Sequence, residues 1–411
     1  MKVLIVATDV WPTAARISIS LAQVGFRVAT VSPARGLVRK IKAVTDHYTY
    51  SPWDGSGSIA AAIRAWRPEL LVCTDDQAVK HLHDLHGTAS RLLDVDSRSL
   101  MQLIETSLGN PKWFHAAEQK SVFMTIASQA GVRCPRTWVI SDDDDASLPE
   151  RAPYPILVKA DGTCGGKGVR AVENECQAQD AIVELSLPIN WPDRVKRSIA
   201  KSIAISGIRW KRHRTICLQQ QISGRPANRA VACHQGNVLA GISVEALETQ
   251  HRFGPASIVR VIEHPEMAAI AKTMVERLQL SGLVGFDFIL DSRNNAWLIE
   301  MNPRVTPICH LHLADGTNLP AEVFSKMTAQ SVAPKPPIVS SDTVVLFPGG
   351  LWQSNRSSGL SSLYLSSFHD VPWDEPELTR ACINYKQRKG LRRHASKLLG
   401  IRELTSKPLE S

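Results

Sequence analysis

The sequence predicts an α/β protein of more than one domain. Three stretches indicate this class: alternating strand and helix signals over residues 1 to about 110, a lysine-bearing strand that enters a glycine-rich loop at 154–168, and an acid-bearing hairpin at 285–304. A chain of 411 residues can bury a sizeable core and usually divides into two or three domains. Each stretch carries its own expectation about structure and chemistry.

Residues 1 to about 110 have the rhythm of a parallel sheet with helices on both faces. The segments that carry it are strands at Val3–Ala7, Val28–Val31 and Leu70–Cys73 and a helix at Arg16–Val24. No Gly-x-Gly-x-x-Gly motif follows the first strand, so a dinucleotide site of the usual kind is not supported. Ligands of such sheets bind beyond the carboxyl ends of the strands, where Asp9, Thr74, Asp75 and Asp76 would lie. Helix capping is the favoured role for these residues.

The hairpin at 285–304 brings oxygen-bearing side chains together. Asp287 interrupts an apolar strand, and Glu300 and Asn302, two residues apart on the next strand, share one face. A buried carboxylate needs a cation or a donor nearby, and carboxylate and amide oxygens suit Mg²⁺, or Mn²⁺. Arg304, again on the Glu300 face, adds a fixed positive group for phosphate or carboxylate. The alternative is an exposed hairpin with solvated acids.

The loop after the strand Tyr154–Ala160 predicts an anion-binding turn. Lys159 lies near the end of the strand, and glycines let the following backbone N–H groups turn towards an anion. The candidate loop residues are Gly162, Thr163, Gly165, Gly166, Lys167 and Gly168. A Walker A loop would need Ser or Thr after Lys167, and the chain has Gly168 there. A plain glycine-rich hairpin is the alternative.

Further candidates come from three other segments. A helix is expected from Asn110–Pro111 to about Gln129, and Lys120 on it would by default be solvated. A strand at 215–225 carries Gln219, Gln220, Gln221 and Ile222. Arg260 follows Gly254–Pro255 on a strand that would return it towards the phosphate end, with an exposed strand cation as the alternative.

The order of these stretches resembles the ATP-grasp superfamily. Glu300-Met301-Asn302-Pro303-Arg304 looks like its metal and phosphate strand, and Asp287 matches its first metal acid. The resemblance implies that Asp287, Glu300 and Asn302 hold magnesium. It also implies that Lys120, Lys159 and the loop from Gly162 to Gly168 contact ATP phosphates.

The same resemblance assigns further roles and a domain order. The backbone of residues 219–222 would read the adenine edge, and Arg304, Arg260 and Lys159 are the candidate catalytic residues. The implied order is a Rossmann-like N-terminal domain at 1–110 and an ATP-grasp domain at 111–330. The latter would have a lid at about 121–218 and a C-terminal lobe at about 219–330. An extension at 338–411 has no assigned role.

The implied activity is an ADP-forming carboxylate–amine ligase, or less often a carboxylate–thiol ligase, that works through an acyl phosphate. One alternative is a bicarbonate-phosphorylating enzyme of the biotin carboxylase or carbamoyl-phosphate synthase kind. The other is a nucleotide-binding module that senses ATP without turnover. The expected partners are ATP, Mg²⁺ and small carboxylate and amine substrates.

Composition favours a reduced, cytoplasmic protein. No apolar run approaches the ~20 residues that cross a bilayer, and the eight cysteines form no Cys-x-x-Cys pair. The net charge of +9 is weak support for nucleic-acid binding, and we expect no nucleic-acid partner. The basic segment at 191–214 is most simply a solvated helix face; contact with an acidic partner or an anionic surface is the sharper hypothesis. The sequence leaves a homodimer open.

Overall fold

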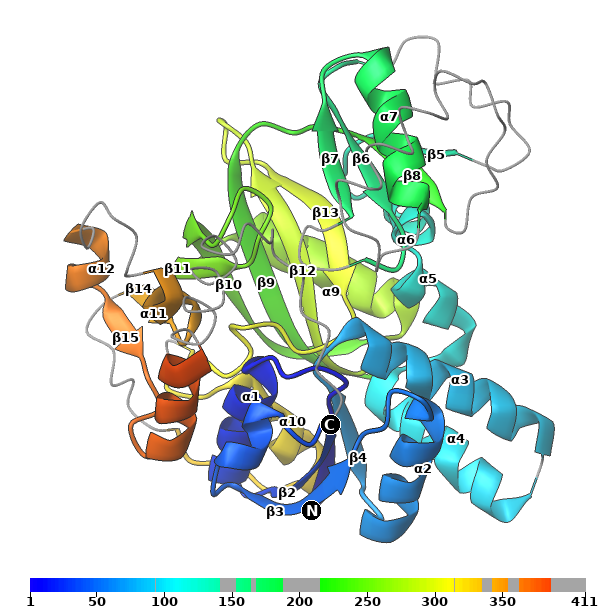
Figure 1. Cartoon of the computed structure of the whole chain (residues 1–411), viewed down its shortest axis with the longest axis vertical. Coiled ribbons are helices and arrows are strands. Elements are labelled where there is room, and N and C mark those ends of the chain that lie inside the picture. The colour runs from blue at the N-terminus through cyan, green and yellow to red at the C-terminus, as the bar shows by residue number, and fades with distance from the viewer. Residues whose placement is uncertain are drawn as a thin grey trace, which may run out of the picture. The chain divides into compact units, whose positions relative to one another are not determined.

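A computed structural model describes residues 1–92, 94–140, 153–163, 168–187, 215–313, 315–334, 342–353 and 362–385. The chain forms two compact units, one of residues 1–134 and 223–381 and one of residues 135–222 and 382–411. The described residues make three sheets, two of them in the first unit (Figure 1). Each unit is described by itself below.

The N-terminal sheet of the larger unit is parallel, as the sequence predicts. Its strands are β1 (Lys2–Val6), β2 (Arg27–Ser32), β3 (Val44–Thr49) and β4 (Leu70–Cys73), in the order β3-β2-β1-β4. The connecting helices are α1 (Thr13–Gln23), α2 (Gly55–Trp66), α3 (Asp76–Leu92) and α4 (Val95–Leu108). Leu4 and Val6 pack with α2, α3 and α4, while Val3 and Ile5 point to the opposite face and are also fully buried. Both faces of this sheet are therefore covered.

The second sheet of this unit has seven strands in the order β13-β12-β9-β10-β11-β14-β15. The strands are β9 (Arg225–His234), β10 (Asn237–Thr249), β11 (Ala256–Ile262), β12 (Gly282–Leu290), β13 (Ala296–Asn302), β14 (Thr343–Leu346) and β15 (Phe368–Asp370). Helices α6 (Lys120–Gln129) and α9 (Pro265–Leu278) pack their buried residues against one face, where Phe286, Phe288 and Leu298 are fully buried. Helix α10 (Leu319–Thr328) contacts β9 and β10.

The segment expected as one helix from 110 to 129 is divided into three pieces. A 3₁₀ turn at Pro111–Trp113 leads into α5 (Phe114–Glu118), Gln119 is extended, and α6 begins at Lys120. Tertiary contacts explain the break. Phe114 stacks on His83 at 3.9 Å and Glu118 binds the same imidazole, so α5 is held to α3 while α6 packs on β13. The break makes Lys120 the first residue of a helix.

The C-terminal extension contributes to the seven-stranded sheet. Strand β14 pairs antiparallel with β11, and β15 pairs parallel with β14. Two short helices, α11 (Gly349–Gln353) and α12 (Ser362–Ser366), lie between these strands in the sequence. Residues 342–381 therefore belong to the larger unit.

The smaller unit holds an antiparallel sheet in the order β5-β8-β6-β7. Its strands are β5 (Thr137–Ile140), β6 (Ile156–Ala160), β7 (Val169–Val172) and β8 (Ile216–Gln220), and α7 (Glu175–Ser186) packs on it. Within the described part of the chain, no helix is long and apolar enough to pass through a bilayer.

Candidate active site

The candidate site is built on the hairpin of β12 and β13. The register pairs Asp287 with Glu300 and Gly285 with Asn302, so the three oxygen-bearing side chains share one face, as expected from the sequence. The neighbouring Phe286 and Phe288 point to the opposite face and anchor the strand in the core. The hairpin thus fixes the polar residues by burying the apolar ones.

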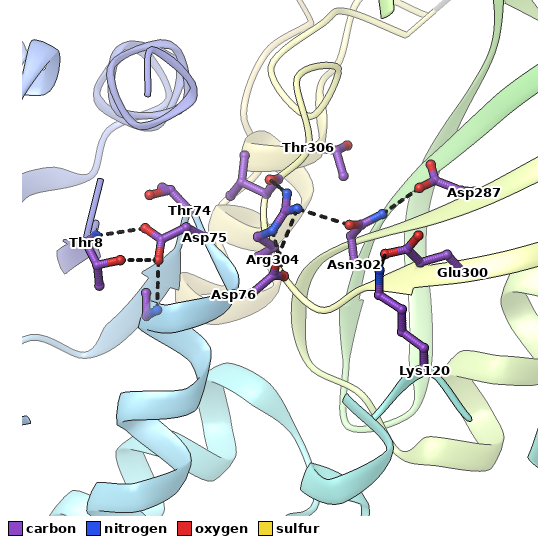
Figure 2. A network of polar contacts seen from close by, with 12 residues as sticks. Thr8, Thr74, Asp75, Asp76, Lys120, Asp287, Glu300, Asn302, Arg304 and Thr306 are labelled. Atoms are coloured by element: carbon purple, nitrogen blue, oxygen red, sulfur yellow. Dashed lines mark hydrogen bonds and ion pairs between the residues drawn. The ribbon is translucent and has the colours of Figure 1, made fainter. Parts of the chain in front are cut away.

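Two amides bind the Asp287 carboxylate. Asn228 Nδ2, from β9, donates to Oδ1 at 2.6 Å, and Asn302 Nδ2 donates to Oδ2 at 2.9 Å (Figure 2). Burial and the neighbouring Glu300 nevertheless raise the pKa of Asp287 above its ordinary value. The sequence does not single out Asn228 as a site residue, because its only signal is an amide in an apolar strand.

Lys120 closes the other side of the site. Its Nζ lies 2.8 Å from Glu300 Oε1, and both side chains are largely buried (Figure 2). Because α6 begins at Lys120, the lysine leaves the helix at its N-terminal end and reaches the β13 carboxylate. The structure therefore brings Lys120, Asp287, Glu300 and Asn302 together.

Arg304 links this cluster to the N-terminal sheet. One of its terminal nitrogens donates to Asn302 Oδ1 at 3.1 Å, and Nε donates to Asp76 Oδ1 at 2.9 Å. A second contact to Asp76 Oδ2 measures 3.4 Å, so the guanidinium faces both carboxylate oxygens (Figure 2). Asp76 is the first residue of α3, just beyond β4. Its carboxylate contacts Arg304, although the sequence favours a helix-capping role for this residue.

The neighbouring Asp75 takes the capping role. Its Oδ1 accepts from the Ala78 backbone N–H at 2.9 Å, while Thr8 donates to it through its hydroxyl and its backbone N–H. This arrangement ties the end of β1 to the start of α3. Burial and the nearby Asp75 raise the pKa of Asp9 to about 6.

Lys159 and the glycine-rich loop lie in the smaller unit. Lys159 is buried on β6 and pairs in register with Val169 and Cys217. Gly162 has a positive φ of 69°, which a residue with a side chain rarely adopts. Thr163 Oγ1 donates to the Ala160 carbonyl at 2.7 Å.

Gly168 closes the described part of this loop. A Cβ added to it would lie 1.9 Å from Thr163 Oγ1, so a larger residue would force the Thr163 side chain to move. Gly165, Gly166 and Lys167, like the basic segment at 191–214, lie outside the described residues.

The residues expected to read adenine lie at the end of β8. Gln219 is buried and donates to Thr137 Oγ1 at 3.2 Å. Gln220 donates its backbone N–H to the Arg136 carbonyl at 2.9 Å, and its side chain accepts from the Arg136 N–H at 3.4 Å. Gln221 and Ile222 follow the strand and are half-buried.

Arg260 is not brought to the cluster. The register runs from Phe288 through Ala227 and Glu245 to Arg260, which places Arg260 on the face opposite Asp287 and three strands away. Its side chain is exposed, with Asp342 Oδ2 at 3.8 Å.

The donor set of the cluster fits a hard divalent cation. Asp287, Glu300 and Asn302 offer carboxylate and amide oxygens, and the buried Asn228 Oδ1 beside them has no donor among the described residues. A cation would also offset burial and the charge of the facing Glu300 carboxylate, which together raise the pKa of Asp287. No group of three or more His, Cys, Asp or Glu side chains in the described ranges is arranged for a metal, so this site depends on its amides.

The family comparison decides the assignment of this region. Residues 117–307 match the family model described as an ATP-grasp domain. These residues are an ATP-grasp domain. The matched span contains Lys120, the Lys159 strand and the β12–β13 hairpin, and the match supports an ATP-dependent ligase. A comparison of the sequence with curated proteins finds no match.

Solved structures share the ATP-grasp fold at low sequence identity. An L-amino acid ligase from Bacillus licheniformis is 13% identical, with a TM-score of 0.52 over 81% of this chain and 77% of its own. The N5-carboxyaminoimidazole ribonucleotide synthetase from Thermotoga maritima is 14% identical, with a TM-score of 0.53 over 82% and 78%. The biotin carboxylase domain of the Hydrogenobacter thermophilus 2-oxoglutarate carboxylase is 13% identical, with a TM-score of 0.54 over 81% and 71%. That structure holds MgADP, ADP and bicarbonate.

Proposed function

We propose that the protein is an ATP- and Mg²⁺-dependent carboxylate–amine ligase that releases ADP and phosphate. The observation that carries the proposal is the oxygen cluster of Asp287, Glu300 and Asn302 on one face of a hairpin, closed by Lys120 2.8 Å from Glu300. Two carboxylates, an amide and a lysine at such distances are the groups that a magnesium–polyphosphate complex needs. A thiol acceptor in place of the amine is compatible with the same site.

The residues divide into metal, phosphate and base contacts. Asp287, Glu300 and Asn302 would hold Mg²⁺ or Mn²⁺, which supplies charge neutralisation at the phosphates. Lys120 would exchange its Glu300 contact for a phosphate oxygen. Lys159 and the loop from Gly162 to Gly168 would bind further phosphate oxygens, and the backbone of residues 219–222 would receive the adenine edge.

The reaction requires positioning more than covalent catalysis. A substrate carboxylate oxygen attacks the γ-phosphorus, the bond to the β-phosphate oxygen breaks, and ADP leaves. The acceptor amine then attacks the acyl carbon, the carbon–oxygen bond to phosphate breaks, and phosphate leaves as the amine loses a proton. Arg304, oriented by Asp76 and Asn302, would stabilise the charge that moves during these transfers. Arg260 lies on the other face of the sheet, so it would act as a catalytic residue only for a substrate that reaches that face.

The proposal also covers the cellular location and a possible binding partner. Seven cysteines in the described ranges are free thiols, which suits the reducing cytoplasm, where we place the reaction. An acidic partner or anionic surface for residues 191–214 remains a proposal. Replacing several of their cations with Gln should weaken such binding and leave ATP turnover unchanged.

A hydroxylamine assay tests the ligase reaction directly. The purified chain is incubated with MgATP and hydroxylamine over a panel of amino acids and small acids, and hydroxamate and ADP are measured. Equal amounts of both products with one class of acid support the proposal. ADP release that depends on bicarbonate alone would replace it with a bicarbonate-phosphorylating enzyme. ATP binding without ADP release across the panel would replace it with an ATP sensor.

A further inference from the structure

A small recess lies at the start of α1, beside the carboxyl end of β1. It is lined by the first turn of α1, by Gln250 and Pro255, by Pro307, and by the extension segment that follows β14. All of these residues belong to the larger unit. The strand order reverses at β1, which has β2 on one side and β4 on the other, and ligands of such sheets bind beyond the strand ends at this point.

The recess is close to the candidate site along the chain. Pro307 follows Arg304 by three residues, so their Cα atoms are at most about 11 Å apart. The intervening Thr306 packs on Gly285 of β12, where a Cβ would lie 2.2 Å from its methyl group. A molecule held in the recess could therefore present a reactive group near Arg304.

The first turn of α1 presents uncapped amides in a buried position. Pro12 precedes the helix and has no side-chain oxygen, and the first turn holds no acidic residue. The N–H groups of Thr13, Ala14 and Ala15 have no acceptor among the described residues, although these residues are at most 7% exposed. A buried helix end without such partners implies that another group supplies them, and the helix dipole favours an anion there.

Arg16, from the same turn, supplies an independent observation. Its side chain is only 10% exposed and lines the recess, and its buried Nε has no acceptor in the described part of the chain. Asp370 of β15 forms an ion pair with one terminal nitrogen, and His310 Nε2 lies 2.7 Å from the other oxygen of that carboxylate. Asp370 thus fixes the guanidinium and offsets its charge, while the Nε donor stays unsatisfied. A buried unsatisfied donor is costly, so an acceptor belongs beside it.

The rest of the recess is apolar. Its wall includes Trp11, Leu346, Phe347 and Pro348, with Gln250 as a further polar side chain. The recess is small enough to suit a group of carboxylate size. Because Asp370 already offsets the charge of Arg16, only the helix end and the Nε donor remain to attract an anion, which favours a singly charged carboxylate over a phosphate dianion.

We propose that this recess binds the carboxylate of the acceptor substrate, an amine that also carries an apolar side chain, such as an α-amino acid. The carboxylate docks on the α1 amides and Arg16, and the side chain lies against the proline and aromatic wall. The α-amino group is then directed towards the acyl group at Arg304. This assignment rests on the proposed ligase function, since it identifies the amine that the ligase uses.

Direct binding to the full-length protein tests the inference without catalysis. Isothermal titration is carried out with L-alanine, L-leucine, L-methionine and L-phenylalanine, and with L-leucinamide, which lacks the carboxylate. We expect at least one amino acid to bind saturably, and the amide to bind about tenfold or more weakly because it loses charge-assisted hydrogen bonds. Equal binding of L-leucine and L-leucinamide, or no binding of any amino acid, overturns the inference.

Two variants and a matched control locate the binding. Thr13→Asp places a carboxylate at the uncapped end of α1, which favours the helix but repels the ligand, and it should weaken binding about tenfold or more. Arg16→Lys keeps a charge for Asp370 and removes the Nε donor, so it should also weaken binding. Ser99→Asp adds the same charge to the exposed face of α4 and should bind as the wild type does. Unchanged binding in a folded Thr13→Asp variant refutes the site.

The outcome is separable from that of the proposed function. The hydroxylamine assay needs no amino-acid acceptor, so its failure in the wild type refutes the ligase. Failure of the titrations with a positive hydroxylamine assay refutes only the recess. If Thr13→Asp raises the KM for the acid that is phosphorylated and leaves acceptor binding unchanged, the recess belongs to that other substrate and the inference is overturned.

Discussion

Asp287 shows how a single residue reveals the chemistry of its surroundings. It faces Glu300 across the hairpin, and two amides, from Asn228 and Asn302, donate to it. Despite these donors, burial and the second carboxylate keep its pKa raised. A divalent cation between the two acids would lower the pKa of both, because it favours their ionised forms.

Glu300→Gln tests this arrangement. The amide keeps the shape of the side chain but removes a metal ligand and the charge that pairs with Lys120. We expect ADP release to fall by at least about 100-fold, with weaker ATP binding, because transfer depends on charge neutralisation at the phosphates. Glu263→Gln, on an exposed residue after β11, is the matched control and should retain wild-type turnover. Full turnover of the Glu300 variant would contradict the metal assignment.

Asp76 is expected to act through Arg304. It fixes the guanidinium through two contacts of 2.9 and 3.4 Å, so Asp76→Asn should loosen Arg304 and lower kcat about tenfold. The carboxylate is half-exposed, and such pairs contribute at most about 1 kcal/mol to stability, so Tm should change little. Steady-state kinetics and thermal unfolding measure the two effects. Asp84→Asn, which removes an exposed pair with Lys80, should change neither, and equal kinetics in both variants would contradict the positioning role.

Among the elements, β15 depends on one buried ionic group. Asp370 on this strand contacts Arg16 of α1 and His310 of the segment after β13, and all three side chains are at most 10% exposed. Truncating one member would leave an uncompensated buried charge, which costs several kcal/mol, whereas the intact group mainly fixes geometry. The three segments are therefore held in one arrangement by a contact that no local sequence pattern contains.

The same group makes stability depend on pH. Burial lowers the pKa of His310, so the unfolded chain takes up a proton near pH 6.5 while the folded chain does not. This contribution is complete above about pH 6.5 and is lost as the pH falls towards the folded pKa. Arg16 and His310 hold the pKa of Asp370 below its ordinary value, which adds a further loss below about pH 4. Acidification weakens the group in both cases.

His310→Gln isolates the histidine contribution. The free energy of unfolding by urea is measured from pH 8 to pH 5 for the wild type and the variant. We expect the difference between them to be constant above about pH 7 and to shift in favour of the variant below pH 6.5, with a slope of up to about 1.4 kcal/mol per pH unit. If the difference in the free energy of unfolding between wild type and variant does not vary with pH, His310 titrates alike in the folded and unfolded states, which contradicts the prediction.

Elements with a strong local pattern were predictable, and those set by distant contacts were not. The alternating residues of β12 and β13 and the apolar run of β1 form the strands that the sequence predicts. The break at Gln119 was missed because contacts with α3 and β13 impose it against helical propensity. Asn228 was not predictable as a site residue, and the contact of Asp76 with Arg304 was not predictable from its expected capping role, because β9 and α3 approach the hairpin only in the folded chain.

At the scale of the whole molecule, the ATP-grasp domain was predictable and its substrate was not. The family motifs lie in single continuous stretches, and the matched span of 117–307 crosses both compact units. The recess beside α1 is instead assembled from segments near residues 13, 250, 307 and 347. A recess lined by segments so far apart in the sequence cannot be predicted from the sequence, because the segments meet only in the folded chain.

The extension completes the seven-stranded sheet, so its removal should expose an edge. Ending the chain after Pro334 removes β14 and β15, uncovers Ile258 and Val259 of β11, and takes away Val344, Val345 and Leu346, which are all buried. The lost burial is roughly 5 kcal/mol, and a long apolar edge promotes pairing between chains. We expect a lower Tm and aggregates in analytical ultracentrifugation. Ending the chain after Tyr385 keeps every described residue and should leave Tm unchanged, so equal stability of the two truncations would show that the sheet holds without its last two strands.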